Sequence, residues 1–121
     1  MHPARFAAVA AAVTLTAFAG GGPGGQSSRA SVPAPSEPNQ VVIYDYKFYP
    51  PTLTVPVGTT VSWINHDTAP HTATHRSYTV EPFDTGELPN GQVYRHTFQT
   101  AGSYAYICIY HQGMQGTIVV Q

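Results

Sequence analysis

Proline and glycine recur so often between residue 40 and the end of the chain that a long helix is excluded there. A proline inside a helix removes a hydrogen bond and clashes with the preceding turn, and no 12-residue window of this region has helical apolar spacing. Short runs of β-branched and aromatic residues, separated by turn residues, make up the region instead. The sequence therefore restricts the fold to the all-β class.

Several runs in this region have the composition of strands. Residues 60–64 are the clearest case, because Val61 and Trp63 alternate with polar neighbours as in a half-buried strand. Turn residues separate the runs every 8–12 residues or so, which is typical of a β-sandwich or a small barrel. We therefore predict an all-β fold of about seven to eight short strands, arranged as a sandwich or a small barrel. The predicted strands are residues 41–48, 53–57, 60–64, 71–75, 92–98, 104–108 and 117–120.

Residues 1–19 have the composition of an export signal that is cleaved from the mature protein. Arg5 precedes an apolar run, and Ala17-Phe18-Ala19 is a small-residue cleavage site. A membrane anchor is the alternative, but the run of about 14 residues is shorter than the roughly 20 that a spanning helix needs. We therefore expect an exported protein, periplasmic or extracellular at the cell surface, with no stable membrane insertion after signal cleavage.

Residues 20–39 are rich in glycine, serine and proline. Such a segment buries too little apolar surface to offset its ordering entropy, so we expect a flexible leader, or a spacer that holds the domain away from a membrane or wall. Residues 40–121 then form the single folded domain, which carries three basic and five acidic residues. This balance offers no basic stripe for nucleic acid and does not identify a partner.

Cys108 is the only cysteine of the chain, so the domain has no internal disulfide. A domain of roughly 80 residues buries only about 60–65% of its unfolded surface and is marginally stable without further support. Small exported domains commonly obtain this support from disulfides or from a bound metal. Metal ligation would also explain why an unpaired thiol persists in an oxidising compartment.

Three further metal donors accompany this cysteine. Cys108, His111 and Met114 lie within seven residues, and His71 lies 37 positions before Cys108. A thiolate, two imidazoles and a weak axial thioether form the ligand set that selects copper for one-electron transfer. The loop between the last two predicted strands would turn three donors toward one point, and His71 would approach from the end of another strand.

Each donor has another interpretation when it is taken alone. Cys108 would be a buried apolar thiol, as many free cysteines are, Met114 would fill the core, and His111 would lie at the surface. Their joint occurrence in this order favours the metal site. A thiol nucleophile with His111 as its base is a further alternative, but the loop offers no obvious oxyanion donors, so we do not predict an enzyme.

The remaining histidines of the domain, His66, His75 and His96, are expected at the surface or on strands. The spacing of His71 and His75 is typical of a zinc pair only when both lie on a helix. On a strand these two positions lie roughly 13 Å apart along the axis, which is too far to share one ion.

The ordered set His71, Cys108, His111 and Met114 in a small exported β-protein resembles the type I blue-copper proteins, the cupredoxins. The Cys-x-x-His-x-x-Met spacing is similar to that of the amicyanin type, whereas the plastocyanin type has a longer gap between histidine and methionine. The resemblance covers nearly all of residues 41–121. Its matching stretches are residues 63–72, 83–86, 96–98 and 101–106.

This resemblance implies an all-β fold, a small Greek-key β-sandwich of the cupredoxin type with roughly seven to eight strands, that binds one type I copper ion. His71 and His111 would bind the ion through imidazole nitrogen, Cys108 as thiolate, and Met114 as the long axial thioether. The protein would be a monomeric, mobile one-electron carrier that docks transiently with redox partner proteins near the His111 edge. A copper storage or delivery protein without electron-transfer duty is the alternative.

Two positions depart from the usual cupredoxin pattern. Thr72 stands where many relatives have asparagine, and a threonine hydroxyl bridges two loops less surely. Ile109 and Tyr110 replace a segment in which proline often precedes the loop histidine. Loop rigidity and reduction potential are therefore the properties that we expect to differ. Tyr110 is either an ordinary surface aromatic or part of a docking surface beside His111.

Overall fold

The computed structural model describes residues 31–76 and 81–121. The predicted export signal, residues 1–19, and most of the predicted leader lie outside the described residues. Residues 32–121 group into one compact unit. Within the described ranges the structure contains eight strands and no helix, so the prediction of an all-β fold is confirmed. The same ranges accordingly hold no helix with the length and apolar character needed to cross a membrane.

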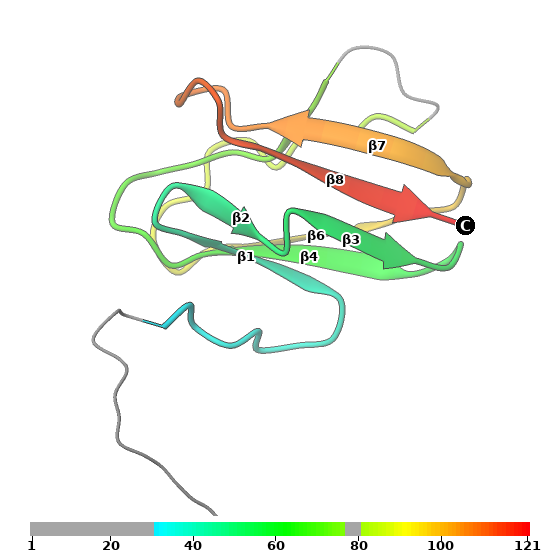
Figure 1. The fold of residues 1–121 in the computed structure, drawn as a ribbon, viewed down its shortest axis with the longest axis horizontal. Helices are drawn as coiled ribbons and strands as arrows, with labels where there is room; N and C mark the ends of the chain where they lie inside the picture. Colours follow the sequence, from blue (N-terminus) through cyan, green and yellow to red (C-terminus); the bar gives the residue numbers. More distant parts are fainter. Residues whose placement is uncertain (1–30, 77–80) are drawn as a thin grey trace, which may run out of the picture. The chain divides into compact units, whose positions relative to one another are not determined.

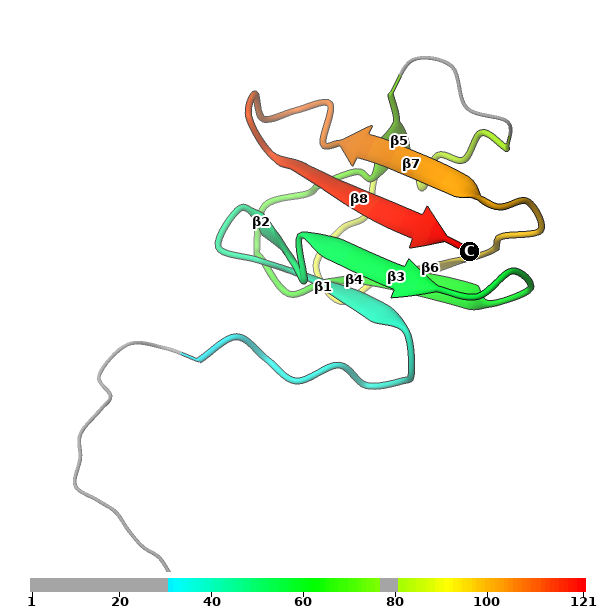
Figure 2. The same ribbon diagram turned by 45° about the vertical axis from the view of Figure 1, so that its right-hand side comes forward.

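Two four-stranded sheets pack against each other as a sandwich (Figures 1 and 2). The first sheet has the order β2 (Lys47–Tyr49), β1 (Gln40–Tyr44), β4 (Thr60–Asn65) and β6 (Val93–Thr97). The second has the order β3 (Thr52–Val55), β8 (Gln115–Val120), β7 (Gly102–Ile107) and β5 (Thr74–His75). β1 pairs with β4 and β3 with β8 in parallel, and the other pairs are antiparallel.

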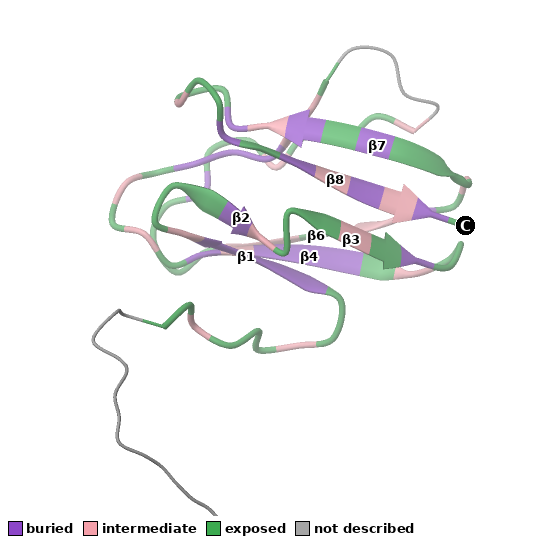
Figure 3. Ribbon diagram, viewed as in Figure 1, coloured by how far each residue is buried: buried purple, intermediate pink, exposed green. Residues whose placement is uncertain are grey.

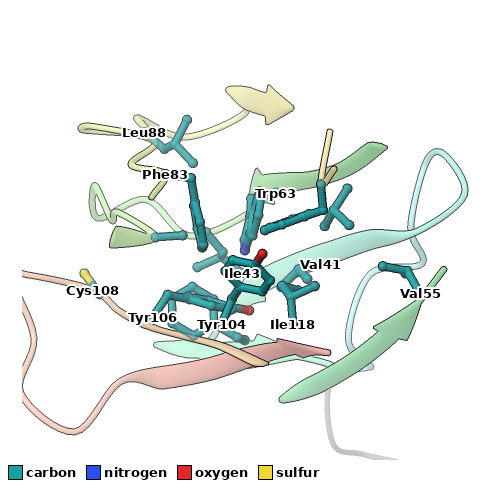
Figure 4. Packing of buried hydrophobic residues seen from close by; sticks show 14 of the residues in the cluster. Val41, Ile43, Val55, Trp63, Phe83, Leu88, Tyr104, Tyr106, Cys108 and Ile118 are labelled. Atoms are coloured by element: carbon teal, nitrogen blue, oxygen red, sulfur yellow. The ribbon is translucent and has the colours of Figure 1, made fainter. Parts of the chain in front are cut away.

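The sheets enclose a core rich in aromatic side chains (Figure 4). Trp63 on β4 is fully buried, stacks on Phe83 with ring centroids 5.1 Å apart, and meets the Tyr106 ring edge-on at 5.7 Å. Buried and exposed residues alternate along β7, where buried Tyr104 and Tyr106 are separated by an exposed residue (Figure 3). Because side chains alternate between the two faces of a strand, Cys108 continues the inward-facing series.

β8 has a glycine at the point where Tyr106 needs room. Gly116 lies opposite Tyr106 in the pairing of β7 with β8. A Cβ atom at position 116 would lie only 2.5 Å from the Tyr106 hydroxyl oxygen. The absence of a side chain at Gly116 therefore lets the Tyr106 ring pack in the core close to the neighbouring strand.

Residues 41–48, which the sequence predicts as one strand, form two strands in the structure. The chain turns between β1 and β2 at Asp45 and Tyr46, whose φ values of 52° and 59° are left-handed. The backbone N–H groups of both residues donate to the carboxylate of Asp67. This acceptor lies on a distant loop, so a tertiary contact overrides the local strand propensity of the segment.

The last residues of the predicted leader contact the first sheet. Arg95 on β6 donates to both carboxylate oxygens of Glu37, at 3.0 and 2.6 Å, and these hydrogen bonds lower the pKa of Glu37. The backbone N–H of Ser36 donates to the side chain of Gln40 at 2.7 Å. β1 begins at Gln40, where the sequence places the start of the domain, although ordered contacts begin a few residues earlier.

Candidate metal centre

Three of the four predicted donors, His71, Cys108 and His111, lie close together in the structure. The Sγ atom of Cys108 lies 3.7 Å from Nδ1 of His71 and 3.5 Å from Nδ1 of His111. The ligand atoms of these three residues all fall within 4.8 Å of one another. Among the histidine, cysteine, aspartate and glutamate side chains of the described ranges, this is the one group of three that is close enough to hold a metal ion.

The segment between β7 and β8 is a tight loop, as the sequence predicts. The two strands are antiparallel neighbours up to the pair Ile107 and Gln115. The N–H of Cys108 donates to the carbonyl of Met114 at 3.0 Å, and the N–H of Met114 donates to the carbonyl of His111 at 3.2 Å. Met114 is buried and belongs to the same core cluster as Cys108. Backbone hydrogen bonds therefore fix the three residues relative to one another.

His71 reaches this group from the segment between β4 and β5. The strand predicted at residues 71–75 is shorter than expected, because β5 covers only its last two residues. His71 instead forms a bridge with Leu88, through backbone hydrogen bonds of 3.2 and 2.7 Å. The side chain of Asn65 also donates to the Leu88 carbonyl, at 2.8 Å. The imidazole of His71 is fully buried as a result.

Thr72 connects the His71 segment to the cysteine loop. Its backbone N–H lies 3.4 Å from Sγ of Cys108, and its hydroxyl oxygen accepts the N–H of Ile109 at 3.0 Å. The hydroxyl of Thr74 donates to the same oxygen at 2.9 Å. Thr72 thus supplies the bridge between the loops that the sequence left uncertain. An N–H donor directed at sulfur also stabilises the negative charge of a thiolate ligand.

Two exposed tyrosines flank the donor group. The Tyr46 ring meets both imidazoles edge-on, with centroids 4.9 Å from that of His71 and 4.6 Å from that of His111. Tyr110 is exposed, as one interpretation of the sequence expects, but its ring centroid lies 6.3 Å from that of His111. Its hydroxyl donates to Glu87 at 2.7 Å, and this hydrogen bond raises the pKa of Tyr110. Sequence reasoning missed Tyr46, because only the turn between β1 and β2 brings it to the donors.

Comparison with known proteins identifies the family of this fold and donor group. The cupredoxin-like domain family matches residues 6–120. The chain belongs to the cupredoxin family. The resemblance read from the ordered donors is therefore confirmed, and the sandwich described above is the cupredoxin sandwich.

Relatives of this cupredoxin include amicyanins and larger copper proteins. Amicyanin-alpha of Methylorubrum extorquens is 33% identical over 123 aligned residues that cover all of both chains. The solved structure of a purple cupredoxin from Nitrosopumilus maritimus is 30% identical, with a TM-score of 0.62 over 68% of this chain and 98% of that chain. A copper-containing nitrite reductase from Thermus scotoductus is 36% identical, with a TM-score of 0.67 over 79% of this chain but only 25% of that chain.

This cupredoxin is an electron-transfer protein with one copper ion as its cofactor, as the sequence predicts. Its relatives do not favour the alternative of copper storage or delivery. The donor set fits the metal, because thiolate sulfur and imidazole nitrogen are ligands that copper prefers. The burial of Cys108 and His71 keeps these two donors away from water.

The other histidines of the cupredoxin domain lie outside the donor group. His66 is exposed, and Nδ1 of His75 lies 2.7 Å from the carbonyl oxygen of Phe83. Nε2 of His96 lies 2.8 Å from the carboxylate of Glu81. The structure thus gives His75 and His96 partners of their own within the sandwich, in keeping with the strand or surface positions expected for them.

We expect Thr72→Val to loosen the connection between the two loops. Valine keeps the backbone N–H near Cys108 but removes the oxygen that accepts the N–H of Ile109, and a lost hydrogen bond of this kind costs about 0.5–1.5 kcal/mol. Denaturant unfolding of the metal-free protein should show this loss, and amide exchange at Ile109 should accelerate. Thr72→Ser keeps the hydroxyl and should resemble the wild type. Equal stability and equal exchange in the valine variant would contradict the bridging role.

Proposed function

We propose that His71, Cys108 and His111 would hold the copper ion, with the thioether of Met114 as the fourth ligand. The observation that carries this assignment is the buried Sγ of Cys108, which lies 3.7 Å from Nδ1 of His71 and 3.5 Å from Nδ1 of His111. The position of buried Met114 on the same closed loop supports its role as this further ligand. When bound, the copper ion supplies a couple between Cu(II) and Cu(I) that accepts and donates one electron.

The protein's own contribution is to hold these donors in a fixed arrangement. Cys108 is tied through its backbone to Met114 and through its sulfur to Thr72, while His71 is tied to Leu88 on the neighbouring segment. Ligands that are already in place move little when the charge of the metal changes. A small rearrangement lowers the barrier to electron transfer, so this rigidity supports the role of an electron carrier rather than an enzyme.

We further propose that redox partner proteins dock transiently near His111. This imidazole is partly exposed, whereas that of His71 is fully buried, so His111 offers the shorter route between the donors and the surface. The exposed apolar side chains of Tyr46, Ile109 and Tyr110 lie on the segments around it. A small surface of this kind is typical of short-lived redox encounters. A monomer would leave this edge open to its partners.

The proposed setting is outside the cytoplasm, in the periplasm or at the cell surface. A signal at residues 1–19 and a leader at residues 20–39 would deliver residues 40–121 as the copper domain, without stable insertion in the membrane. An unpaired thiol in an oxidising compartment is at risk of oxidation, and ligation to a metal protects it. The enclosed position of Cys108 supports this arrangement.

Addition of Cu(II) to the metal-free protein tests the proposed ligands and geometry together. We expect a strong visible absorption from charge transfer between the thiolate and Cu(II), which saturates at one equivalent. A colourless copper-loaded protein would sink the assignment. Rates of copper exchange and of electron transfer to a small redox partner separate the two functions, because a carrier retains its metal through many turnovers and a delivery protein does not.

A further inference from the structure

Asp67 places one carboxylate between the donor group and the turn that carries Tyr46. It lies four residues before His71, and its side chain is 11% exposed. Its Oδ2 atom lies 2.8 Å from Nε2 of His71. The same carboxylate accepts the backbone N–H of Asp45 at 2.7 Å and that of Tyr46 at 2.9 Å. Three donors from two distant parts of the chain thus meet on one side chain.

The backbone of Asp67 is anchored independently of its carboxylate. The N–H of Asp67 donates to the side-chain oxygen of Asn65 at 2.8 Å, and its carbonyl accepts from the side chain of Asn90 at 2.8 Å. These bonds hold the loop between β4 and His71 in place. The carboxylate is therefore presented in a fixed direction, which a positioning role requires.

The contact with His71 determines which nitrogen of that ring is available to a metal. A carboxylate accepts hydrogen bonds and does not donate them, so the proton of the neutral imidazole belongs on Nε2. Nδ1, which faces Cys108, then keeps its free lone pair.

The contact with the turn determines where Tyr46 lies. Asp45 and Tyr46 both have left-handed backbone conformations, which are unfavourable for a residue such as tyrosine. Two charge-assisted hydrogen bonds to Asp67 compensate for that strain. With the turn held in this way, the Tyr46 ring stands edge-on against His71 and His111, and it touches a donor from each of the two loops.

We propose that Asp67 is a positioning residue that sets the tautomer of His71 and clamps Tyr46 against both imidazoles, so that one side chain organises two sides of the copper site. This inference deepens the proposed function and rests on its ligand assignment. Partners that hold the second nitrogen of a ligating histidine orient the ring and raise its basicity. Here the same partner also fixes the aromatic cover of the site.

Asp67→Ala and Asp67→Asn in the full chain test the proposal, and Asp45→Asn is the control variant. Alanine removes the acceptor, and asparagine keeps the size but replaces one acceptor oxygen by a donor group. Asp45→Asn removes a negative charge from the turn between β1 and β2 and leaves the backbone N–H of residue 45 in place. The Asp45 carboxylate is exposed, lies 3.6 Å from Lys47 and takes no part in the contact between Asp67 and His71. Asparagine also tolerates the left-handed conformation at position 45.

The first measurement uses NMR of the metal-free proteins. In the wild type and in Asp45→Asn, we expect a slowly exchanging Nε2–H signal from His71 and protected amides at Asp45 and Tyr46. Asp67→Ala should lose the imidazole signal and expose the two amides, whereas Asp67→Asn keeps one acceptor oxygen and should lose only part of this protection. The second measurement is Cu(II) affinity, where loss of a partner to a ligating histidine typically costs about 10–100-fold. We expect a loss of this size in the Asp67 variants and none in Asp45→Asn.

The two measurements separate the possible failures. Wild-type affinity in the Asp67 variants, with a protected His71 Nε2–H, would overturn the positioning role. An equal loss of affinity in Asp45→Asn would also overturn it, because the effect would then be one of charge alone. Exposed amides with unchanged affinity and an unchanged imidazole signal would reduce Asp67 to a support for the turn. If the wild type itself binds no copper, the ligand assignment fails, while the metal-free spectra still decide whether Asp67 holds His71 and Tyr46.

Discussion

Replacing Cys108 with serine is expected to abolish the visible absorption of the Cu(II) protein completely. The absorption requires a thiolate bound to Cu(II), and Cys108 is the only cysteine of the chain, so no other residue can take over. Serine is nearly the same size, but its hydroxyl is a hard and weakly acidic donor that does not replace a soft thiolate. An absorption titration with Cu(II) measures the effect directly, and tight copper binding should be lost with the colour.

Two controls make the Cys108→Ser result interpretable. The metal-free variant should keep the wild-type far-ultraviolet circular dichroism, since the substitution changes one atom at the end of a strand. His66→Gln alters an exposed histidine outside the donor group and should leave the absorption intact. A serine variant that is still blue would show that the colour has another source, and the ligand assignment would then be wrong.

The order and spacing of the donors pointed to three residues that the structure brings close together. Cys108, His111 and Met114 lie on one short loop, and a loop that joins antiparallel neighbours must close tightly. The chain has only one cysteine, so Cys108 was the one candidate for a thiolate ligand. The pairing of His71 was harder to predict from the sequence. An isolated backbone bridge to Leu88 holds this residue, outside any regular strand.

The supporting residues could not be predicted because tertiary contacts create their roles. Asp67 and Tyr46 lie 21 positions apart, and nothing in the local sequence shows that the carboxylate of one binds the backbone of the other. Tyrosine is a residue type that favours strands, yet Tyr46 lies in a left-handed turn. The Asp67 carboxylate, from another loop, accepts the backbone N–H groups of this turn. An acidic residue four positions before His71, a proposed ligand, is the one signal that the sequence offered in advance.

Thr72 shows the limit of arguing from residue type alone. Its hydroxyl could have bonded to its own backbone, as threonine hydroxyls often do. In the structure it accepts the N–H of Ile109 and the hydroxyl of Thr74 at the same time, which links the two loops. Thr72 therefore bridges the two loops, although many relatives have asparagine at this position.

Trp63→Ala is expected to remove a large part of the stability of the metal-free domain. The Trp63 side chain is fully buried between the sheets and touches the rings of Phe83 and Tyr106. Replacing a buried tryptophan with alanine typically costs about 3–5 kcal/mol, through lost burial and the cavity left behind. Domains have roughly 0.05–0.15 kcal/mol of stability per residue, so a domain of about 80 residues has roughly 4–12 kcal/mol in total. Denaturant unfolding followed by circular dichroism measures the loss.

The comparison that tests this expectation uses an apolar residue of the same domain outside its core. Val57→Ala shortens an exposed side chain and should change the free energy of unfolding by no more than about 0.5 kcal/mol. Trp63→Phe keeps an aromatic ring in the stack with Phe83 and should fall between the two. Because Trp63 is none of the proposed ligands, an alanine variant that folds is expected to show the visible absorption of the wild type. A loss below about 1 kcal/mol in Trp63→Ala would mean that the sheets close over the cavity, since the cost of such substitutions falls as the site collapses.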